Sequence, residues 1–205
     1  MDILRRADKL QPGSPGRDEV LLLMLKKLST LEATFIVLMA ACGIALKPVV
    51  GPMAKLVGSA LFIPSGALAG AVYMMWPMLA LLVVRRFGAA LLVGLLEGII
   101  LLVTGLYGSH GFLSLAIYVL PCLIIDVGFW AIKRFNNHWL LFVPTAFGNV
   151  TGTALVGIII MHMPTIPLLA SLAPAFIFGG IGGLFAGALY RLLIKSFPQF
   201  HKKEN

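Results

Sequence analysis

The sequence predicts an all-α, polytopic membrane protein, a bundle of six transmembrane helices with both the N- and the C-terminus in the cytoplasm. Of its 205 residues 60% are hydrophobic and 12% are charged, and the mean hydropathy is +0.99. A soluble domain of this size needs a polar surface, which this composition cannot supply. Three long stretches, 35–46, 67–84 and 111–125, contain no charged residue. Such stretches are typical of helices that cross lipid.

Six segments come close to the roughly 20 apolar residues that a helix needs to cross about 30 Å of hydrocarbon. We expect these helices near 31–50, 66–84, 88–106, 112–132, 143–161 and 168–194. Turn-forming residues separate them at 85–88, 105–111, 136–137 and 162–164. The stretch 47–64 holds Pro48, Gly51, Pro52 and Pro64 around a short apolar segment. We expect it to be an outer or re-entrant loop, covered by protein or water.

The basic residues indicate the orientation. Fourteen of the 16 Lys and Arg residues lie before residue 31, at 85–86, at 133–134 or after residue 190. Lys47 and Lys55 are the exceptions, and the loops 105–111 and 162–167 contain no basic residue. The positive-inside rule then places both termini in the cytoplasm. A basic rim beside anionic membrane lipid accounts for the net charge of +8, so no nucleic-acid partner is expected.

The predicted domain organisation has three parts: a cytoplasmic N-terminal segment (1–30), a six-helix transmembrane domain (31–195) and a basic cytoplasmic tail (196–205). Within the first part, the apolar residues 20–28 fit either a short helix lying on the membrane or a cytoplasmic extension of the first transmembrane helix. The first thirty residues carry no sign of a cleavable signal peptide. Cys42 and Cys122 lie in apolar runs, so no disulfide framework is expected.

Catalytic and energy-coupling motifs are missing from the sequence. It has no G-x-x-x-x-G-K-[ST] phosphate loop, no H-E-x-x-H, no G-x-S-x-G and no C-x-x-C. We therefore expect neither an enzyme nor a resident cofactor or metal. His110 and His162 both fall on the predicted outer side, which keeps a shallow metal or haem contact open as an alternative.

Two acidic residues fall within the predicted helices, Glu97 near the middle of the bilayer and Asp126 towards its cytoplasmic side. A charge at such depth costs roughly 2.5–3.5 kcal/mol, so both side chains should face the protein interior. Glu97 is either a ligand for a cationic or hydrogen-bonding substrate, or a protonated or paired structural residue. For Asp126 we favour a structural role, paired with Lys133 or Arg134.

Aromatic and polar side chains gather at the predicted outer half of the bundle. The candidate substrate-binding residues are Glu97, Tyr73, Trp76, Tyr107, His110 and Tyr118. Aromatic residues at this depth serve either as interfacial anchors or as a stacking platform for a flat heterocycle. Pro77 should kink the second helix, and we expect the neighbouring Trp76 to line a cavity.

Small residues mark two helix faces where other helices can approach closely. One face of the first helix carries Ala33, Val37, Ala41 and Ala45, and is the candidate interface with another membrane subunit. The last helix contains five glycines, for which packing within the bundle is a sufficient explanation: Gly179, Gly180, Gly182, Gly183 and Gly187.

With these features the chain resembles the substrate-binding S component of an energy-coupling factor (ECF) vitamin transporter. The resemblance covers most of the chain in its size, six helices, cytoplasmic termini and the Ala41-x-x-x-Ala45 motif. The stretches 85–91 (RRFGAAL) and 124–129 (IIDVGF) are similar to the YkoE-type, thiamine-related branch. The acids in the third helix of that branch do not coincide with Glu97.

The resemblance implies a multi-pass protein in the cell membrane of a prokaryote, with a transmembrane scaffold (T) subunit and two cytoplasmic ATPase subunits as partners. It would take up a scarce micronutrient from an outward cavity closed by the 47–65 and 105–111 loops. The residues favour a small ring compound such as thiamine or a related pyrimidine, with haem or another cofactor as the alternative. From other classes, a small membrane scaffold or assembly protein without a transported ligand and a stand-alone channel or facilitator stay open.

Overall fold

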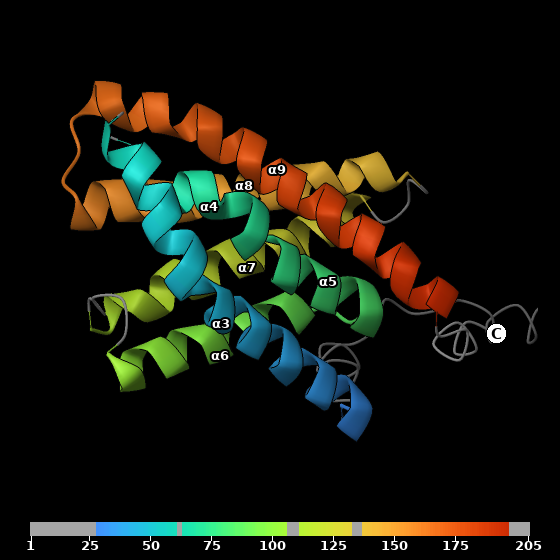
Figure 1. Cartoon of the computed structure of the whole chain (residues 1–205). Coiled ribbons are helices and arrows are strands. Elements are labelled where there is room, and N and C mark those ends of the chain that lie inside the picture. Colours follow the sequence, from blue (N-terminus) through green and yellow to red (C-terminus); the bar gives the residue numbers. More distant parts are fainter. Residues whose placement is uncertain (1–27, 61–62, 106–110, 133–136, 197–205) are drawn as a thin grey trace, which may run out of the picture. The chain divides into compact units, whose positions relative to one another are not determined.

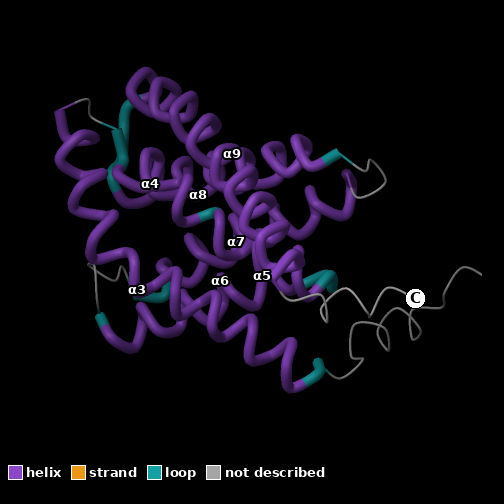
Figure 2. The backbone as a smooth tube through the Cα atoms, turned by 45° about the vertical axis from the view of Figure 1, so that its right-hand side comes forward, coloured by secondary structure: helices purple, strands orange, loops and turns teal. Residues whose placement is uncertain are grey.

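The computed structural model describes residues 28–60, 63–105, 111–132 and 137–196, and these form helices and loops without a strand (Figure 2). The all-α fold class is thus confirmed. The chain divides into two units, residues 1–33 and 34–205. In the first unit, the amide of Ser29 donates a hydrogen bond of 2.9 Å to the Glu32 carboxylate at the start of a helix. The N-terminal segment 1–27 and the tail 197–205 lie outside the described residues.

Every predicted transmembrane segment is helical where the structure describes it. Three are single helices and two are built from shorter pieces, and the sixth is short, with the following bounds: α3 (Thr30–Ala60), α4 (Ser65–Tyr73) with α5 (Met75–Val84), α6 (Ala89–Thr104), α7 (Leu113–Ile132), the 3₁₀-helix η1 (His138–Leu141) with α8 (Phe142–Leu155) and the π-helix η2 (Val156–Ile160), and α9 (Thr165–Ser196). In the described part of the chain, five of these segments are long and apolar enough to cross a membrane, and α6 is a shorter apolar helix. The protein is therefore polytopic.

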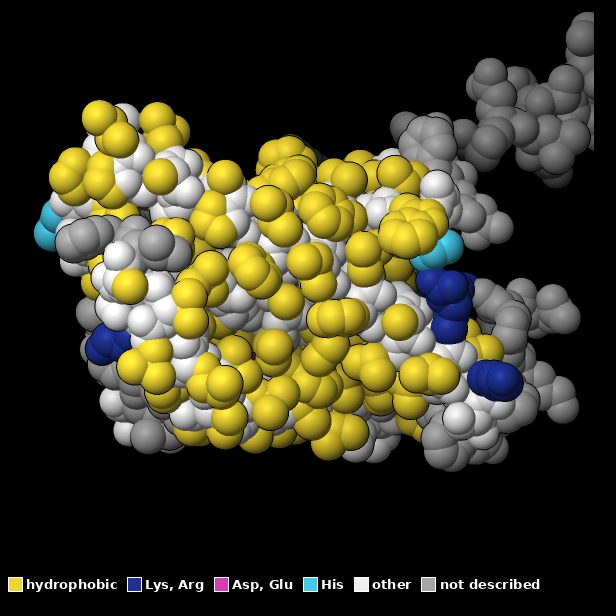
Figure 3. Space-filling view, turned by 45° about the horizontal axis from the view of Figure 1, so that its top comes forward, with side chains coloured by type: hydrophobic (Ala, Val, Ile, Leu, Met, Phe, Trp, Pro, Cys, Tyr) yellow, Lys and Arg dark blue, Asp and Glu magenta, His cyan; other side chains and the backbone are white. Residues whose placement is uncertain are grey.

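In the second unit the helices pack around α5. Helix α8 lies between α7 and α9, α6 packs against α5 and α7, and both α4 and α5 pack against α9 (Figure 1). The core joins buried side chains of α5, such as Met78 and Leu81, with Ala40 of α3, Val93 of α6 and Ile125 of α7. On the face drawn in Figure 3, hydrophobic side chains form a broad band, and Lys, Arg and His lie at its two ends. That distribution suits a lipid-facing surface.

The predicted loop at 47–64 is wrong over residues 47–60, because α3 continues as a helix to Ala60 and includes both Pro48 and Pro52. A proline removes one backbone amide and leaves the carbonyl four residues earlier without its helical partner. Membrane helices tolerate this loss when the surroundings support the helix on either side. Both prolines are exposed.

The predicted kink at Pro77 is confirmed as a break between α4 and α5. Pro77 cannot donate to the carbonyl of Tyr73, which is the last residue of α4, and the helix restarts at Met75. The predicted turn at 85–88 is confirmed as well. Arg85 ends α5 with a φ angle of 54°, in the left-handed region that commonly ends a helix, and Gly88, just before α6, has a φ angle of 91°.

Asp126 of α7 is completely buried and binds the first turn of α6. Its Oδ2 accepts a hydrogen bond of 2.8 Å from the amide of Leu91. The first amides of a helix lack partners within the helix, and a carboxylate there satisfies one of them and interacts favourably with the helix dipole. This contact supports the structural interpretation of Asp126. Its predicted partners, Lys133 and Arg134, lie outside the described residues.

We expect Asp126→Ala to lower the free energy of unfolding by about 1–2 kcal/mol, as loss of a helix cap does. Asp126→Asn should cost less, because the amide oxygen can still accept from Leu91. The measurement is unfolding by sodium dodecyl sulfate in mixed micelles, followed by circular dichroism. Thr104→Ala, which removes an exposed hydroxyl bonded within α6 at its other end, is the control. Equal stability of Asp126→Ala and the wild type would contradict the capping role.

Candidate functional site

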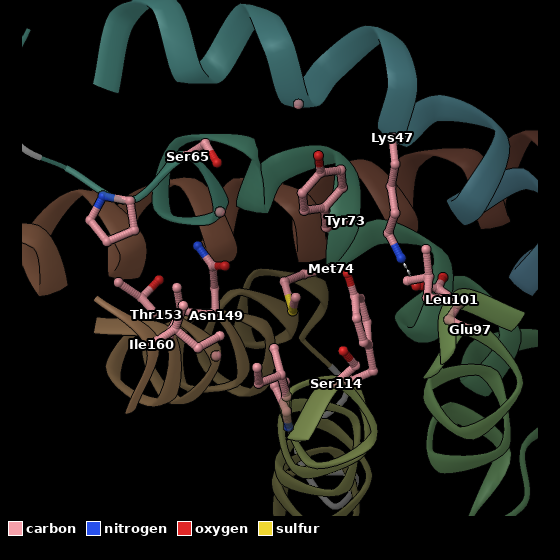
Figure 4. Close-up of a pocket in the computed structure, with 18 of the residues that line it drawn as sticks. Lys47, Ser65, Tyr73, Met74, Glu97, Leu101, Ser114, Asn149, Thr153 and Ile160 are labelled. Carbon is pink, nitrogen blue, oxygen red and sulfur yellow. Dashed lines mark hydrogen bonds and ion pairs between the residues drawn. The ribbon is translucent and has the colours of Figure 1, made fainter. Parts of the chain in front are cut away.

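A buried ion pair connects α3 to α6. The Nζ of Lys47 lies 2.5 Å from Oε2 of Glu97, and the two side chains are only 5% and 8% exposed (Figure 4). The second carboxylate oxygen fits against Gly43, where any Cβ would collide with it. An unpaired charge buried at this depth is strongly unfavourable, and here each side chain compensates the charge of the other. Glu97 is thus a paired residue, as one of its two interpretations predicts.

Two glycines bring α7 close to this pair. Gly94 lies three residues before Glu97 on one face of α6, and Gly98 lies four residues after Gly94 on the same side of the helix. A Cβ at Gly94 would lie 2.5 Å from the backbone oxygen of Tyr118, and one at Gly98 would lie 3.3 Å from Cα of Leu115. Because both positions lack a side chain, α7 approaches α6 at the level of Glu97. This approach places Tyr118 beside the ion pair.

Two tyrosines flank the lysine. The Nζ of Lys47 lies 4.0 Å from the centre of the Tyr118 ring and 5.9 Å from that of Tyr73. A cation at this distance from an aromatic face is attracted by the ring electrons. The ammonium group therefore has two kinds of partner, a carboxylate and an aromatic ring. The predicted aromatic platform around Glu97 contains a buried cation.

The ion pair borders a cavity of about 940 Å³. The second half of α3 lines one side, and α4, α6, α7 and α8 with η2 line the others (Figure 4). Lys47, Glu97, Tyr73 and Tyr118 contribute to its wall, as do Asn149 and Thr153 of α8. Sites for small molecules typically enclose about 300–1,000 Å³ and combine apolar walls with a few polar groups. This cavity has both properties.

The structure brings three of the six predicted binding residues together. Glu97, Tyr73 and Tyr118 all line the cavity. Trp76 is not among its lining residues, and instead packs against the core beside Gly43. Tyr107 and His110 lie outside the described residues. Whether any of these residues binds a substrate stays a prediction.

Lys47 is a residue of the site that the sequence analysis missed, because it begins the stretch 47–64, which was interpreted as a loop. Its position has a signal in the sequence. Ile36, Ala40 and Gly43 precede Lys47 at spacings of four and three residues, and all four are buried. Such spacing defines one face of a helix. Extending that face by four residues from Gly43 would have placed Lys47 in the bundle interior.

Most of the predicted interface of α3 with another membrane subunit lies in the second unit. In the second unit Val37, Ala41 and Ala45 are exposed, on the side of the helix away from the buried face. Ala33 belongs to the first unit. Exposed small residues at this spacing are what close contact with another membrane helix requires. The interface itself stays a prediction.

Among the described residues, no three His, Cys, Asp or Glu side chains gather in a way that could hold a metal ion. The cavity contains Cys122 and Glu97 of these types, and Glu97 is paired with Lys47. His162 follows η2 with a φ angle of 45° and is not among the lining residues. The described residues therefore bring no metal-binding cluster to the cavity.

Comparison with known families gives a match. The sequence profile of a family described as ABC-type cobalt transport system, permease component, matches residues 33–154, more than half of the chain. No curated protein and no solved structure matches. The matched region includes the ion pair, both tyrosines and most of the cavity wall. This is a family of transporter components and not of enzymes. The chain belongs to this family and is a membrane component of an ABC-type transport system.

Proposed function

We propose that this protein is the substrate-binding S component of an ECF-type importer, which captures a vitamin-like micronutrient for ATP-driven uptake. The observation that carries the proposal is the cavity of about 940 Å³ inside the bundle, with the Lys47–Glu97 pair in its wall. A membrane component whose only task is to hold partners together has no need of a polar, aromatic-lined cavity. A component that binds solute needs one.

The paired charges narrow the substrate chemistry. Glu97 offers hydrogen-bond acceptors and Lys47 offers donors, so the pair together suits an edge that carries a donor beside an acceptor. The amino group and adjacent ring nitrogen of a 4-aminopyrimidine form such an edge. Tyr73, next to the pair, adds an aromatic surface for a flat ring. These features favour thiamine or a related pyrimidine.

Energy and partners would come from other chains. The sequence contains no phosphate-binding loop, so ATP hydrolysis requires separate ATPase subunits. The exposed face of Val37, Ala41 and Ala45 is our candidate for contact with a transmembrane scaffold subunit. In this arrangement residues 31–195 form the transmembrane domain, and both termini lie in the cytoplasm of a prokaryotic cell.

A thermal-shift screen of the detergent-purified protein tests the proposal, with B vitamins, their precursors, haem and Co²⁺ as probes. A true substrate at a hundredfold excess over its dissociation constant should add about 2.7 kcal/mol of stability. Glu97→Gln should reduce that shift relative to its own unliganded stability. Lys195→Gln, at the exposed end of α9, should leave it unchanged.

The outcomes separate the alternatives. A shift for one vitamin or precursor that Glu97→Gln reduces supports an S component and names its substrate. A shift for Co²⁺ alone would replace the vitamin with a metal cargo, and one for haem alone would favour the cofactor alternative. No shift from any probe, with a well-folded protein, would favour a scaffold without a transported ligand.

A further inference from the structure

Thr153 of α8 has a buried hydroxyl without a hydrogen-bond partner among the described residues. The residue lines the cavity and is 3% exposed. Two other threonines of α8 bond to the carbonyl four residues earlier, Thr145 to Leu141 at 2.9 Å and Thr151 to Phe147 at 2.8 Å. Thr153 does not make this usual helical bond. Buried polar groups in proteins nearly always have a partner, so this hydroxyl calls for one.

Asn149 lies one helical turn before Thr153, on the same face of α8, and also lines the cavity. Its amide nitrogen donates to the carbonyl oxygens of Ala67 at 3.1 Å and Ala175 at 2.8 Å. Two acceptors fix which end of the amide is nitrogen, so the side chain cannot flip without losing both bonds. The Asn149 oxygen is left as an acceptor that no described residue uses.

The packing around Asn149 leaves room for its amide in this orientation. A Cβ at Gly70 of α4 would collide with the Asn149 amide, and one at Gly179 of α9 would collide with its Cβ. Asn149 is 3% exposed, so its amide is held between α4 and α9 and not by solvent. Such support from neighbouring elements is what a precise binding group requires.

We propose that Asn149 and Thr153 form a second recognition subsite, which binds a hydroxyl group of the substrate. The ligand hydroxyl would donate to the Asn149 oxygen and accept from the Thr153 hydroxyl. In the close-up these two residues lie on the other side of the cavity from Lys47 and Glu97 (Figure 4). The substrate class is therefore a small ring compound with a donor–acceptor edge at one end and a hydroxyl on a side arm. This inference rests on the proposed function.

Matched probes test the subsite in the detergent-purified full chain. One pair is thiamine and its analogue with ethyl in place of hydroxyethyl, and the other is 4-amino-5-hydroxymethyl-2-methylpyrimidine and its 5-methyl analogue. Dissociation constants are measured by isothermal titration calorimetry. For at least one pair, wild type should bind the hydroxyl form about tenfold more tightly, the worth of one hydrogen bond.

Thr153→Val removes the hydroxyl at nearly constant shape. It should weaken binding of that hydroxyl probe about tenfold and leave its hydroxyl-free analogue unchanged. Thr153→Ser, which keeps the hydroxyl, should restore the preference. Thr151→Val, on the same helix and outside the cavity, should change neither.

Two results would overturn the subsite. One is wild-type binding without any preference for a hydroxyl form, which can be measured even if Thr153→Val does not fold. The other is an equal loss of both members of a pair in Thr153→Val, which would indicate a packing role. If wild type binds none of the four probes, the proposed thiamine-like substrate fails, and the subsite fails with it.

Discussion

Replacing Lys47 with methionine is expected to lower the free energy of unfolding by about 3–5 kcal/mol. That is the usual cost of removing one partner of a buried ion pair, because the other charge stays buried without compensation. Methionine matches the length of the lysine stem, so the loss reports on the charge more than on the packing. The measurement is unfolding by sodium dodecyl sulfate in mixed micelles at pH 7.

The double variant Lys47→Met with Glu97→Gln should recover most of this loss, because neither charge remains. Lys55→Met is the matched control, since Lys55 is an exposed lysine of the same helix that also borders the cavity. It should change stability by no more than about 0.5 kcal/mol. Additive losses in the double variant would show that the two residues act independently, against the close contact between them.

The double variant also separates the effect of the ion pair on stability from its effect on binding. If the pair recognises the substrate, the double variant should be stable and still fail to bind any compound that stabilises the wild type. If the pair only joins α3 to α6, the double variant should bind as the wild type does. A thermal-shift measurement with the compound identified in the screen distinguishes these outcomes.

The sequence predicted the helices well, because hydropathy and turn residues follow directly from the chemistry of the bilayer. It failed at 47–60, where Pro48 and Pro52 were taken to end a helix. That rule holds best in water, where an unpaired carbonyl is readily solvated outside a helix. In lipid, leaving the helix exposes many more backbone groups than a proline removes, and the helix continues.

The candidate site could be predicted only in part. The depth of Glu97 follows from its place within one apolar segment, and burial follows from the cost of a charge at that depth. Its partner lies 50 residues earlier on another helix, and no pattern within one segment reveals which faces meet. For the same reason the sequence does not reveal the contacts of the Asn149 amide, because its two acceptors belong to α4 and α9.

The glycines of α9 illustrate what a pattern within one helix does reveal. All five are buried, as their predicted role in packing within the bundle requires: Gly179, Gly180, Gly182, Gly183 and Gly187. They differ in what they face. At Gly183 a Cβ would collide with the backbone oxygen of Leu141 and with the hydroxyl of Thr145. At Gly187, one turn later, the nearest atom is a terminal methyl of Leu141 at 2.9 Å.

Gly183→Ala is therefore expected to lower the free energy of unfolding by about 3 kcal/mol, at the upper end for an overpacked core. The carbonyl of Leu141 belongs to the backbone where η1 meets α8, so α8 and α9 must separate to admit the new methyl group. Gly187→Ala should change stability by no more than about 1 kcal/mol, because a leucine methyl can rotate away and alanine favours the helix. Unfolding by sodium dodecyl sulfate compares the two variants directly. Equal effects at both positions would mean that α8 and α9 are not in backbone contact at Gly183, and that the glycines serve helix flexibility instead.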